Sequence, residues 1–138
     1  MRRPEQNLYD TLKRNKPKGC LIMRVENETQ PGMPDVFLQF KDTGLNCWVE
    51  LKVATVPAKL DTRLLKKDAF QKSQPGWHLQ YTAHGGRSVI LIRDDKKNLY
   101  VVPGHHIERI KELSYYQMTT RYRVGDWAEA FETMGEDE

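Results

Sequence analysis

The sequence has few cysteines and no long hydrophobic segment. Its 138 residues include only two cysteines, Cys20 and Cys47, and both lie in apolar segments, where cysteine packs as a small hydrophobic side chain. Neither a disulfide framework nor a Cys/His metal motif is therefore expected. No segment approaches the roughly 18 apolar residues of a membrane span, and the first residues lack the apolar core of a signal peptide. We expect a cytoplasmic protein without a membrane partner.

The sequence also lacks internal repeats and low-complexity tracts, and its length predicts a single domain over residues 1–138. Its charges are unevenly distributed. The last fourteen residues, 125–138, hold six acidic residues and no lysine or arginine, so residues 1–124 have 22 basic and 13 acidic residues, a net charge of +9. Residues 114–138 are interpreted as a C-terminal extension that ends in an acidic tail. The basic body indicates a protein that binds a polyanion.

The most informative stretch is a predicted β-hairpin. Two apolar-rich segments, residues 35–41 and 47–53, flank a short glycine-containing turn. Because side chains alternate along a strand, Glu50 and Lys52 share one face of the second segment. The same alternation lets Asp35 point toward Glu50 across the hairpin. Two carboxylates and one lysine are therefore expected to converge.

These are the groups that a magnesium-dependent phosphodiester hydrolase needs. Mg²⁺ takes oxygen ligands and keeps several waters, so Asp35, Glu50, a backbone carbonyl and the scissile phosphate would suffice. Lys52 would orient or help to deprotonate the attacking water and would stabilise developing charge. The alternative is an ordinary solvated Glu–Lys pair. The second segment, however, has the pattern of a strand buried on both faces, where charged groups need a partner.

Helices and strands are expected in the order α-β-β-β-α-β-β-α, which predicts a mixed central β-sheet flanked by helices. The predicted helices cover residues 4–14, 74–84 and 104–113, and the other strands cover residues 20–25, 88–93 and 99–102. Ser73 is the predicted N-cap of the second helix. In the tail, Trp127, Phe131 and Met134 form the apolar edge of a further helix. This helix is expected to dock on the core, and competition with DNA is the alternative.

Residues 55–73 are basic, and their leucines, Leu60, Leu64 and Leu65, have helical spacing. The basic residues are Lys59, Arg63, Lys66, Lys67 and Lys72. They form either a solvated amphipathic face or a surface that contacts phosphates beside the predicted metal site. The histidines, including His78 and His84, are expected to face solvent or to be hydrogen-bonded rather than to ligate a metal.

Three motifs in this order resemble a known family. They are Gly32-Met33-Pro34-Asp35, then Glu50-Leu51-Lys52, and then Gln74-Pro75-Gly76-Trp77-His78 followed by Gly85-Gly86-Arg87-Ser88. Over roughly residues 5–93 the chain looks like a phage-type stand-alone member of the virus-type replication-repair nuclease family, VRR-NUC, within the PD-(D/E)xK nuclease superfamily. The resemblance implies an α/β protein with a restriction-endonuclease-like core.

The resemblance also implies roles for single residues. Asp35 and Glu50, with the carbonyl of Leu51, would bind Mg²⁺ or Mn²⁺, and Lys52 would be the catalytic lysine. Gln74 matches a polar helix residue that holds water or substrate, and Glu5 matches an acidic residue on the first helix. Two assignments stay open: Glu26 or Glu28 is the alternative to Glu5, and Gln71 is the alternative to Gln74.

The function expected from the residues and the resemblance is a metal-dependent DNA endonuclease in a bacterial or phage-infected cell. Stand-alone phage members of the family suggest cleavage of branched DNA or Holliday junctions in replication, recombination or repair, by a homodimer that makes two symmetric nicks. Two alternatives stay open. One is a non-catalytic DNA-binding or replication accessory module, although a degenerate site should have lost Asp35, Glu50 or Lys52. The other is a sequence-specific restriction-type nuclease of the same superfamily.

Overall fold

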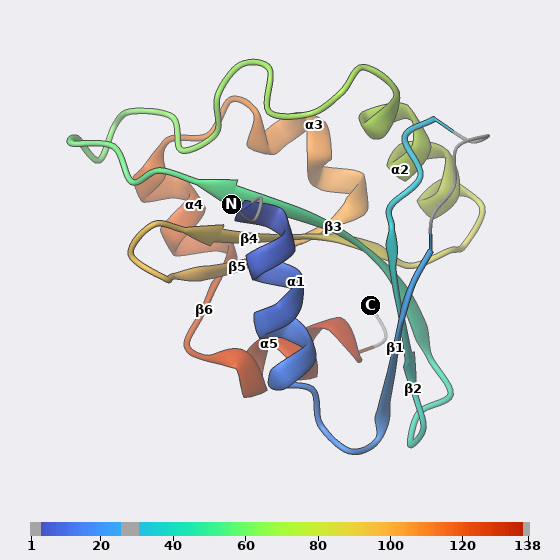
Figure 1. The fold of residues 1–138 in the computed structure, drawn as a ribbon. Helices are drawn as coiled ribbons and strands as arrows, with labels where there is room; N and C mark the ends of the chain where they lie inside the picture. Colours follow the sequence, from blue (N-terminus) through green and yellow to red (C-terminus); the bar gives the residue numbers. More distant parts are fainter. Residues whose placement is uncertain (1–3, 26–30, 137–138) are drawn as a thin grey trace.

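The protein folds around one mixed β-sheet of six strands, in the spatial order β1-β2-β3-β4-β5-β6 (Figure 1). The computed structural model describes residues 4–25 and 31–136. The strands are β1 (Cys20–Arg24), β2 (Val36–Phe40), β3 (Asn46–Ala54), β4 (Ser88–Asp94), β5 (Leu99–Pro103) and β6 (Arg123–Val124). Among the strands of the described residues, only β3 and β4 pair in parallel, because the chain crosses from one to the other through helix α2 (Ser73–Ala83).

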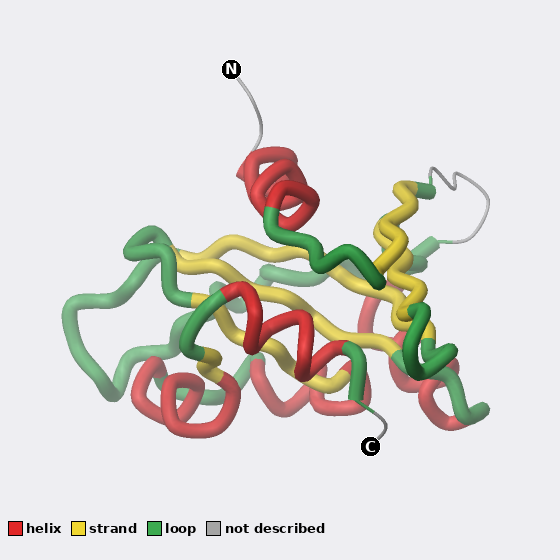
Figure 2. The backbone as a smooth tube through the Cα atoms, turned by 90° about the horizontal axis from the view of Figure 1, so that it is seen from below, coloured by secondary structure: helices red, strands yellow, loops and turns green. Residues whose placement is uncertain are grey.

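The remaining helices lie on both sides of the sheet (Figures 1 and 2). They are α1 (Pro4–Arg14), α3 (Ile107–Ile110), α4 (Tyr115–Tyr122) and α5 (Trp127–Met134), with a 3₁₀ turn, η1 (Gly104–His106), before α3. This arrangement confirms the expected α/β class, and it is consistent with the restriction-endonuclease-like core that the resemblance implied. Among the described residues, no helix is both long and apolar enough to span a bilayer.

Each face of the sheet has its own hydrophobic core. On one face α1 and α5 bury Leu8, Leu12, Phe131 and Met134 against strand residues that include Val49 and Leu51. On the other face Leu64 and Leu65 pack with α3 and α4 against strand residues that include Ile90, Ile92 and Tyr100. The tail helix α5 therefore docks on the core through its apolar edge, as predicted.

The predicted hairpin is confirmed, and the structure sets its register. Val36 pairs with Val49 and Phe37 with Trp48 in an antiparallel ladder. The pairing with β2 stops at Val49, whereas β3 continues along β4 as far as Ala54. The segment of β3 that carries the predicted catalytic residues therefore extends beyond the start of β2.

Residues 55–72, whose leucines have helical spacing, are not among the predicted helices, and they form an irregular segment between β3 and α2. Residues 55–72 have no helix: Leu60 is 60% exposed, while the adjacent Leu64 and Leu65 are both buried. The backbone of this segment accepts hydrogen bonds from the start of α4. The first two N–H groups of α4 donate to the carbonyls of Thr62 and Leu60, at 2.7 and 2.9 Å. This segment is therefore an irregular loop that supplies backbone acceptors to the start of α4.

The boundaries of two helices also differ from the prediction. Helix α2 begins at Ser73, so Lys72 and not Ser73 holds the N-cap position, without a side-chain cap. The chain enters α2 through a turn in which Gln74 N donates to Gln71 O at 3.0 Å, and not from the extended backbone that a serine cap needs. Helix α3 ends at Ile110 instead of residue 113, and the chain continues through turn hydrogen bonds to Ser114, whose extended backbone forms the capping box of α4.

Gly32, in the segment before β2, packs closely against the start of α2. Its φ is +86°, and a Cβ atom added there would lie 2.3 Å from the Ser73 carbonyl oxygen. Gly44, in the hairpin turn, also has a positive φ, +70°, but an added Cβ would have no atom within 4 Å. The two glycines share the same backbone requirement and differ in the space around them.

This difference predicts that Gly32→Ala destabilises the protein more than Gly44→Ala does. Both variants carry the same backbone strain, so the difference between them comes from the steric contact of the new Cβ with Ser73. We expect Gly32→Ala to lose about 1–3 kcal/mol more of the free energy of unfolding than Gly44→Ala. Urea denaturation of both variants measures it. Equal losses would show that α2 does not pack against Gly32.

Candidate active site

The predicted site residues line one cavity of about 660 Å³, between α1, β3 and α2. Its walls contain Glu5, Gln6, Arg24, Met33, Asp35, Glu50, Leu51, Lys52, Gln71 and Gln74. All six residues that the resemblance singled out are in this set. Residues from four separate segments of the chain are thus brought to one place. Glu26 and Glu28, the alternatives to Glu5, lie outside the described residues.

The hairpin positions Asp35 and Glu50. Asp35 directly precedes β2, and its carbonyl accepts a hydrogen bond at 2.8 Å from the N–H of Val25, the residue after β1, which fixes the Asp35 backbone. Glu50 follows the last β2 partner of β3 and is only 8% exposed. Lys52 lies on the same face of β3, two residues further on. The carboxylates and the ammonium group therefore face a common space, as the alternation predicted.

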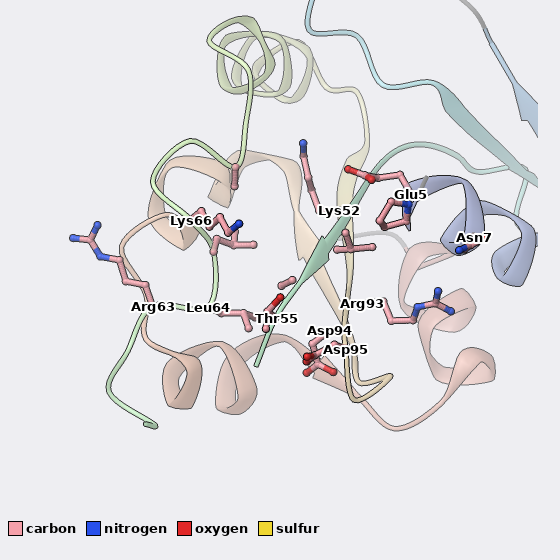
Figure 3. Close-up of a pocket in the computed structure, with 15 residues that line it drawn as sticks. Glu5, Asn7, Lys52, Thr55, Arg63, Leu64, Lys66, Arg93, Asp94 and Asp95 are labelled. Atoms are coloured by element: carbon pink, nitrogen blue, oxygen red, sulfur yellow. The ribbon is translucent and has the colours of Figure 1, made fainter. Parts of the chain in front are cut away.

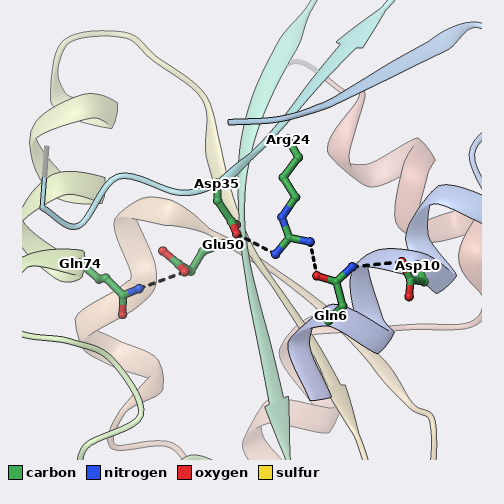
Figure 4. Close-up of polar contacts among 6 residues, drawn as sticks. All are labelled: Gln6, Asp10, Arg24, Asp35, Glu50 and Gln74. Carbon is green, nitrogen blue, oxygen red and sulfur yellow. Dashed lines mark hydrogen bonds and ion pairs between the residues drawn. The ribbon is translucent and has the colours of Figure 1, made fainter. Parts of the chain in front are cut away.

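Gln74, on the first turn of α2, contacts Glu50 directly (Figure 4). Its Nε2 donates to Glu50 Oε2 at 3.0 Å, while its own Oε1 accepts from Gln71 N at 2.8 Å. The Gln71 backbone therefore orients the Gln74 side chain. Of the two glutamines left open by the sequence, Gln74 is the one whose side chain holds Glu50.

Arg24 is a site residue that the sequence interpretation missed. Its Nη2 lies 3.3 Å from Asp35 Oδ2, and its Nη1 donates to Gln6 Oε1 at 2.6 Å. Gln6 in turn donates to Asp10, so a polar chain runs from α1 to Asp35 (Figure 4). The guanidinium also lies over the Tyr9 ring, 4.6 Å from its centroid. The sequence feature that could have identified Arg24 as a site residue is a single arginine at the end of an apolar strand that precedes a polar loop.

His78 lies behind Glu50, on the next turn of α2. It is completely buried, its Nδ1 is 2.8 Å from Ser88 Oγ, and its Nε2 is 3.6 Å from Glu50 Oε1. The expectation that this histidine is hydrogen-bonded holds, but its position beside Glu50 was missed. The signal was present in the sequence, because residues four apart, such as Gln74 and His78, share one face of a helix.

Lys52 faces a second cavity of about 640 Å³ that adjoins the first (Figure 3). The two cavities share Glu5 and Lys52 in their walls. The ammonium of Lys52 lies over the Phe70 ring, 5.3 Å from its centroid, so the segment before α2 helps to hold the lysine. Phe70 belongs to no sequence motif that could have indicated its contact with Lys52.

Asp94, which lines the second cavity, and its partner Tyr100 serve the fold. Asp94 is 3% exposed and accepts hydrogen bonds from Tyr100, Asn98 and two backbone N–H groups at 2.7 to 2.9 Å. Burial raises the pKa of the Tyr100 hydroxyl above its ordinary value, and the hydrogen bond to Asp94 raises it further. Tyr100 therefore remains a donor, and Asp94 has its oxygens occupied by the β4–β5 turn.

The donor set suits a hard divalent cation with few protein ligands. Asp35 and Glu50 supply carboxylate oxygens to one cavity, and Glu50 Oε1 is buried without a hydrogen-bond partner. Within residues 4–25 and 31–136, no group of three or more His, Cys, Asp and Glu side chains gathers as a metal centre. Glu5 lines the cavity without forming such a group. Two carboxylates completed by waters and phosphate oxygens are typical of Mg²⁺.

The five basic residues proposed to contact DNA are all exposed on the segment between β3 and α2. Arg63 and Lys66 line the second cavity, next to Lys52 (Figure 3). Arg63 also pairs with Glu112 at 2.7 Å, which ties this segment to the turn after α3. Lys59, Lys67 and Lys72 lie on the same segment outside the cavity walls.

Among the comparisons with known proteins, a similarity is found to solved structures. No protein-family model matches the sequence, and no curated protein matches it. Among solved structures, the chain is similar to Hjc, a Holliday junction resolvase from the archaeal hyperthermophile Archaeoglobus fulgidus, with 13% identity and a TM-score of 0.48, over 92% of this chain and 88% of that one. At this level of similarity, function has to be inferred from the residues of the site.

Proposed function

We propose that this protein is a metal-dependent DNA endonuclease that cleaves branched DNA. The observation that carries the proposal is the convergence of Asp35, Glu50 and Lys52 on one cavity, with Glu50 buried and held by Gln74. A solvated Glu–Lys pair would not need a buried carboxylate, because burial of a charge is costly unless a partner compensates for it.

In this proposal Asp35 and Glu50, with the carbonyl of Leu51, hold Mg²⁺ or Mn²⁺. When bound there, the cation supplies polarisation of a phosphoryl oxygen and a more acidic water. Lys52 places its positive charge where negative charge develops on the phosphate, and it orients the attacking water. The water oxygen bonds to phosphorus as one phosphorus–ester oxygen bond breaks, and the proton lost by the water ends on the leaving oxygen.

The surroundings of the cavity favour a nucleic acid as substrate. The basic segment between β3 and α2 adjoins Lys52, and the chain outside its acidic tail has a net charge of +9 over residues 1–124. Phosphate contacts of this kind position a backbone without reading bases, which suits recognition of DNA by shape. The preference for branched DNA, and a homodimer that makes two symmetric nicks, follow from the motif resemblance to stand-alone phage nucleases.

The proposal is tested by nicking of matched DNA substrates. A synthetic four-way junction, a flap and a plain duplex of the same sequence are incubated with Mg²⁺ or Mn²⁺ and either wild type or Lys52→Ala. We expect metal-dependent nicking of the junction by the wild type and its loss in the variant. Binding without cleavage under every metal would instead favour a non-catalytic accessory module, and cutting of unbranched duplex at one defined site would favour a restriction-type nuclease.

A further inference from the structure

The region behind Glu50 contains two buried polar atoms without hydrogen-bond partners. They are Glu50 Oε1 and His78 Nε2, and they face each other at 3.6 Å. This distance is longer than a hydrogen bond. Buried polar groups are nearly always satisfied, so a pair that is not requires an explanation, and a functional role is a common one.

Two side chains of α2 lie next to the two oxygens of the Glu50 carboxylate. Gln74 Nε2 donates to Glu50 Oε2 at 3.0 Å, and His78 Nε2 faces Oε1 from the next turn of α2. The carboxylate therefore has a neighbour from α2 at each oxygen. A rotation of the Glu50 side chain would separate it from both.

The opposite side of the imidazole is fixed by β4. Ser88 Oγ lies 2.8 Å from His78 Nδ1, and a serine hydroxyl that donates there leaves the ring proton on Nε2, toward Glu50. Gly104 provides the room for this contact, because a Cβ atom added there would lie 2.0 Å from Ser88 Oγ and 3.0 Å from His78 Nδ1. The sequence thus has a glycine where any side chain would displace the serine.

We propose that His78 is a positioning residue that fixes the carboxylate of Glu50 in one orientation for binding a divalent cation, with Ser88 setting the direction of its ring proton. This rests on the proposed function, since it assigns Glu50 to cation binding. Polar partners that orient a metal ligand typically contribute about 10–100-fold to metal affinity or activity. His78 acts through Glu50, and it touches neither substrate nor cation.

The experiment measures cation binding separately from cleavage. Mn²⁺ affinity is determined by isothermal titration calorimetry without DNA for wild type, His78→Leu, His78→Gln and Ser88→Ala, and thermal unfolding is recorded for each. We expect His78→Leu to weaken Mn²⁺ binding by about 10–100-fold. His78→Gln, whose amide can still donate toward Glu50, should recover most of that affinity. Ser88→Ala should give a smaller loss with His78 intact, which keeps the test valid if His78→Leu does not fold.

A matched control is available on the same helix. His84, at the C-cap of α2, is exposed, and its ring bonds to the Gln80 carbonyl, so His84→Leu removes an imidazole without touching the site. It should leave Mn²⁺ affinity unchanged, which also excludes adventitious binding to surface histidine as the source of the signal.

The outcomes separate this inference from the proposed function. Lower melting temperatures with unchanged Mn²⁺ affinity in the His78 and Ser88 variants would give His78 a structural role only and would overturn the inference. A His78-dependent Mn²⁺ affinity in a protein that nicks no DNA would support the inference and refute the nuclease. A wild type that binds no Mn²⁺ would refute both.

Discussion

Glu50→Gln is expected to lower the rate of metal-dependent junction nicking by about a thousandfold, because loss of one carboxylate ligand removes several kcal/mol of charge stabilisation and each 1.36 kcal/mol is tenfold in rate. The substitution keeps the shape of the side chain and the acceptor for Gln74. It removes only the negative charge from a residue that is 8% exposed. The loss should therefore appear in the catalytic rate, measured by single-turnover nicking at saturating enzyme.

The stability of Glu50→Gln should not fall together with its activity. A buried carboxylate is costly to desolvate, so its neutral replacement should leave the free energy of unfolding unchanged or increase it. Asp61→Asn, an exposed acid in the segment before α2, serves as the charge-matched control and should retain the wild-type rate. A Glu50→Gln protein that nicks as fast as the wild type, or that loses activity only because it unfolds, would contradict the assignment of Glu50.

The hairpin and its convergence of charges could be predicted because they follow from local rules. Strand alternation assigned Glu50 and Lys52 to one face. The register, in which Phe37 pairs with Trp48, was not predicted and comes from the structure. The motif spacing added Gln74. These inferences needed only the order of residues within about 40 positions of sequence.

The rest of the site depends on contacts that no local pattern encodes. Arg24 reaches Asp35 because β1 pairs with β2, and it is supported from α1 by Gln6. His78 reaches Glu50 only once α2 lies across β3. Its spacing from Gln74 showed that the two residues share a face, but not that this face meets a carboxylate.

The segment between β3 and α2 shows how tertiary contacts override periodicity. Leu60, Leu64 and Leu65 have the spacing of a helix, yet Leu64 and Leu65 are buried side by side, and an isolated bridge pairs Arg63 with Ser114. The partners of this segment lie some fifty residues later in the chain, so the leucine spacing alone did not show how the segment packs.

Phe131→Ala, in the tail helix, is expected to reduce the free energy of unfolding by about 3–5 kcal/mol, as for other large-to-small core substitutions. Phe131 is 3% exposed and belongs to the same hydrophobic core as Leu8 and Val49, although it lies in the acidic end of the chain. Urea denaturation measures the loss. Glu132→Ala, at the next and exposed position of α5, should change stability by no more than about 0.5 kcal/mol.

The same pair of variants decides what the acidic tail does. Because α5 is docked through Phe131 and Met134, Glu132 is left facing solvent. If the tail only completes the core, Glu132→Ala should bind junction DNA as the wild type does, while Phe131→Ala should lose binding in proportion to its unfolded fraction. Tighter DNA binding by Phe131→Ala, with stability near that of the wild type, would contradict docking and would instead indicate a tail that competes with DNA for the basic surface.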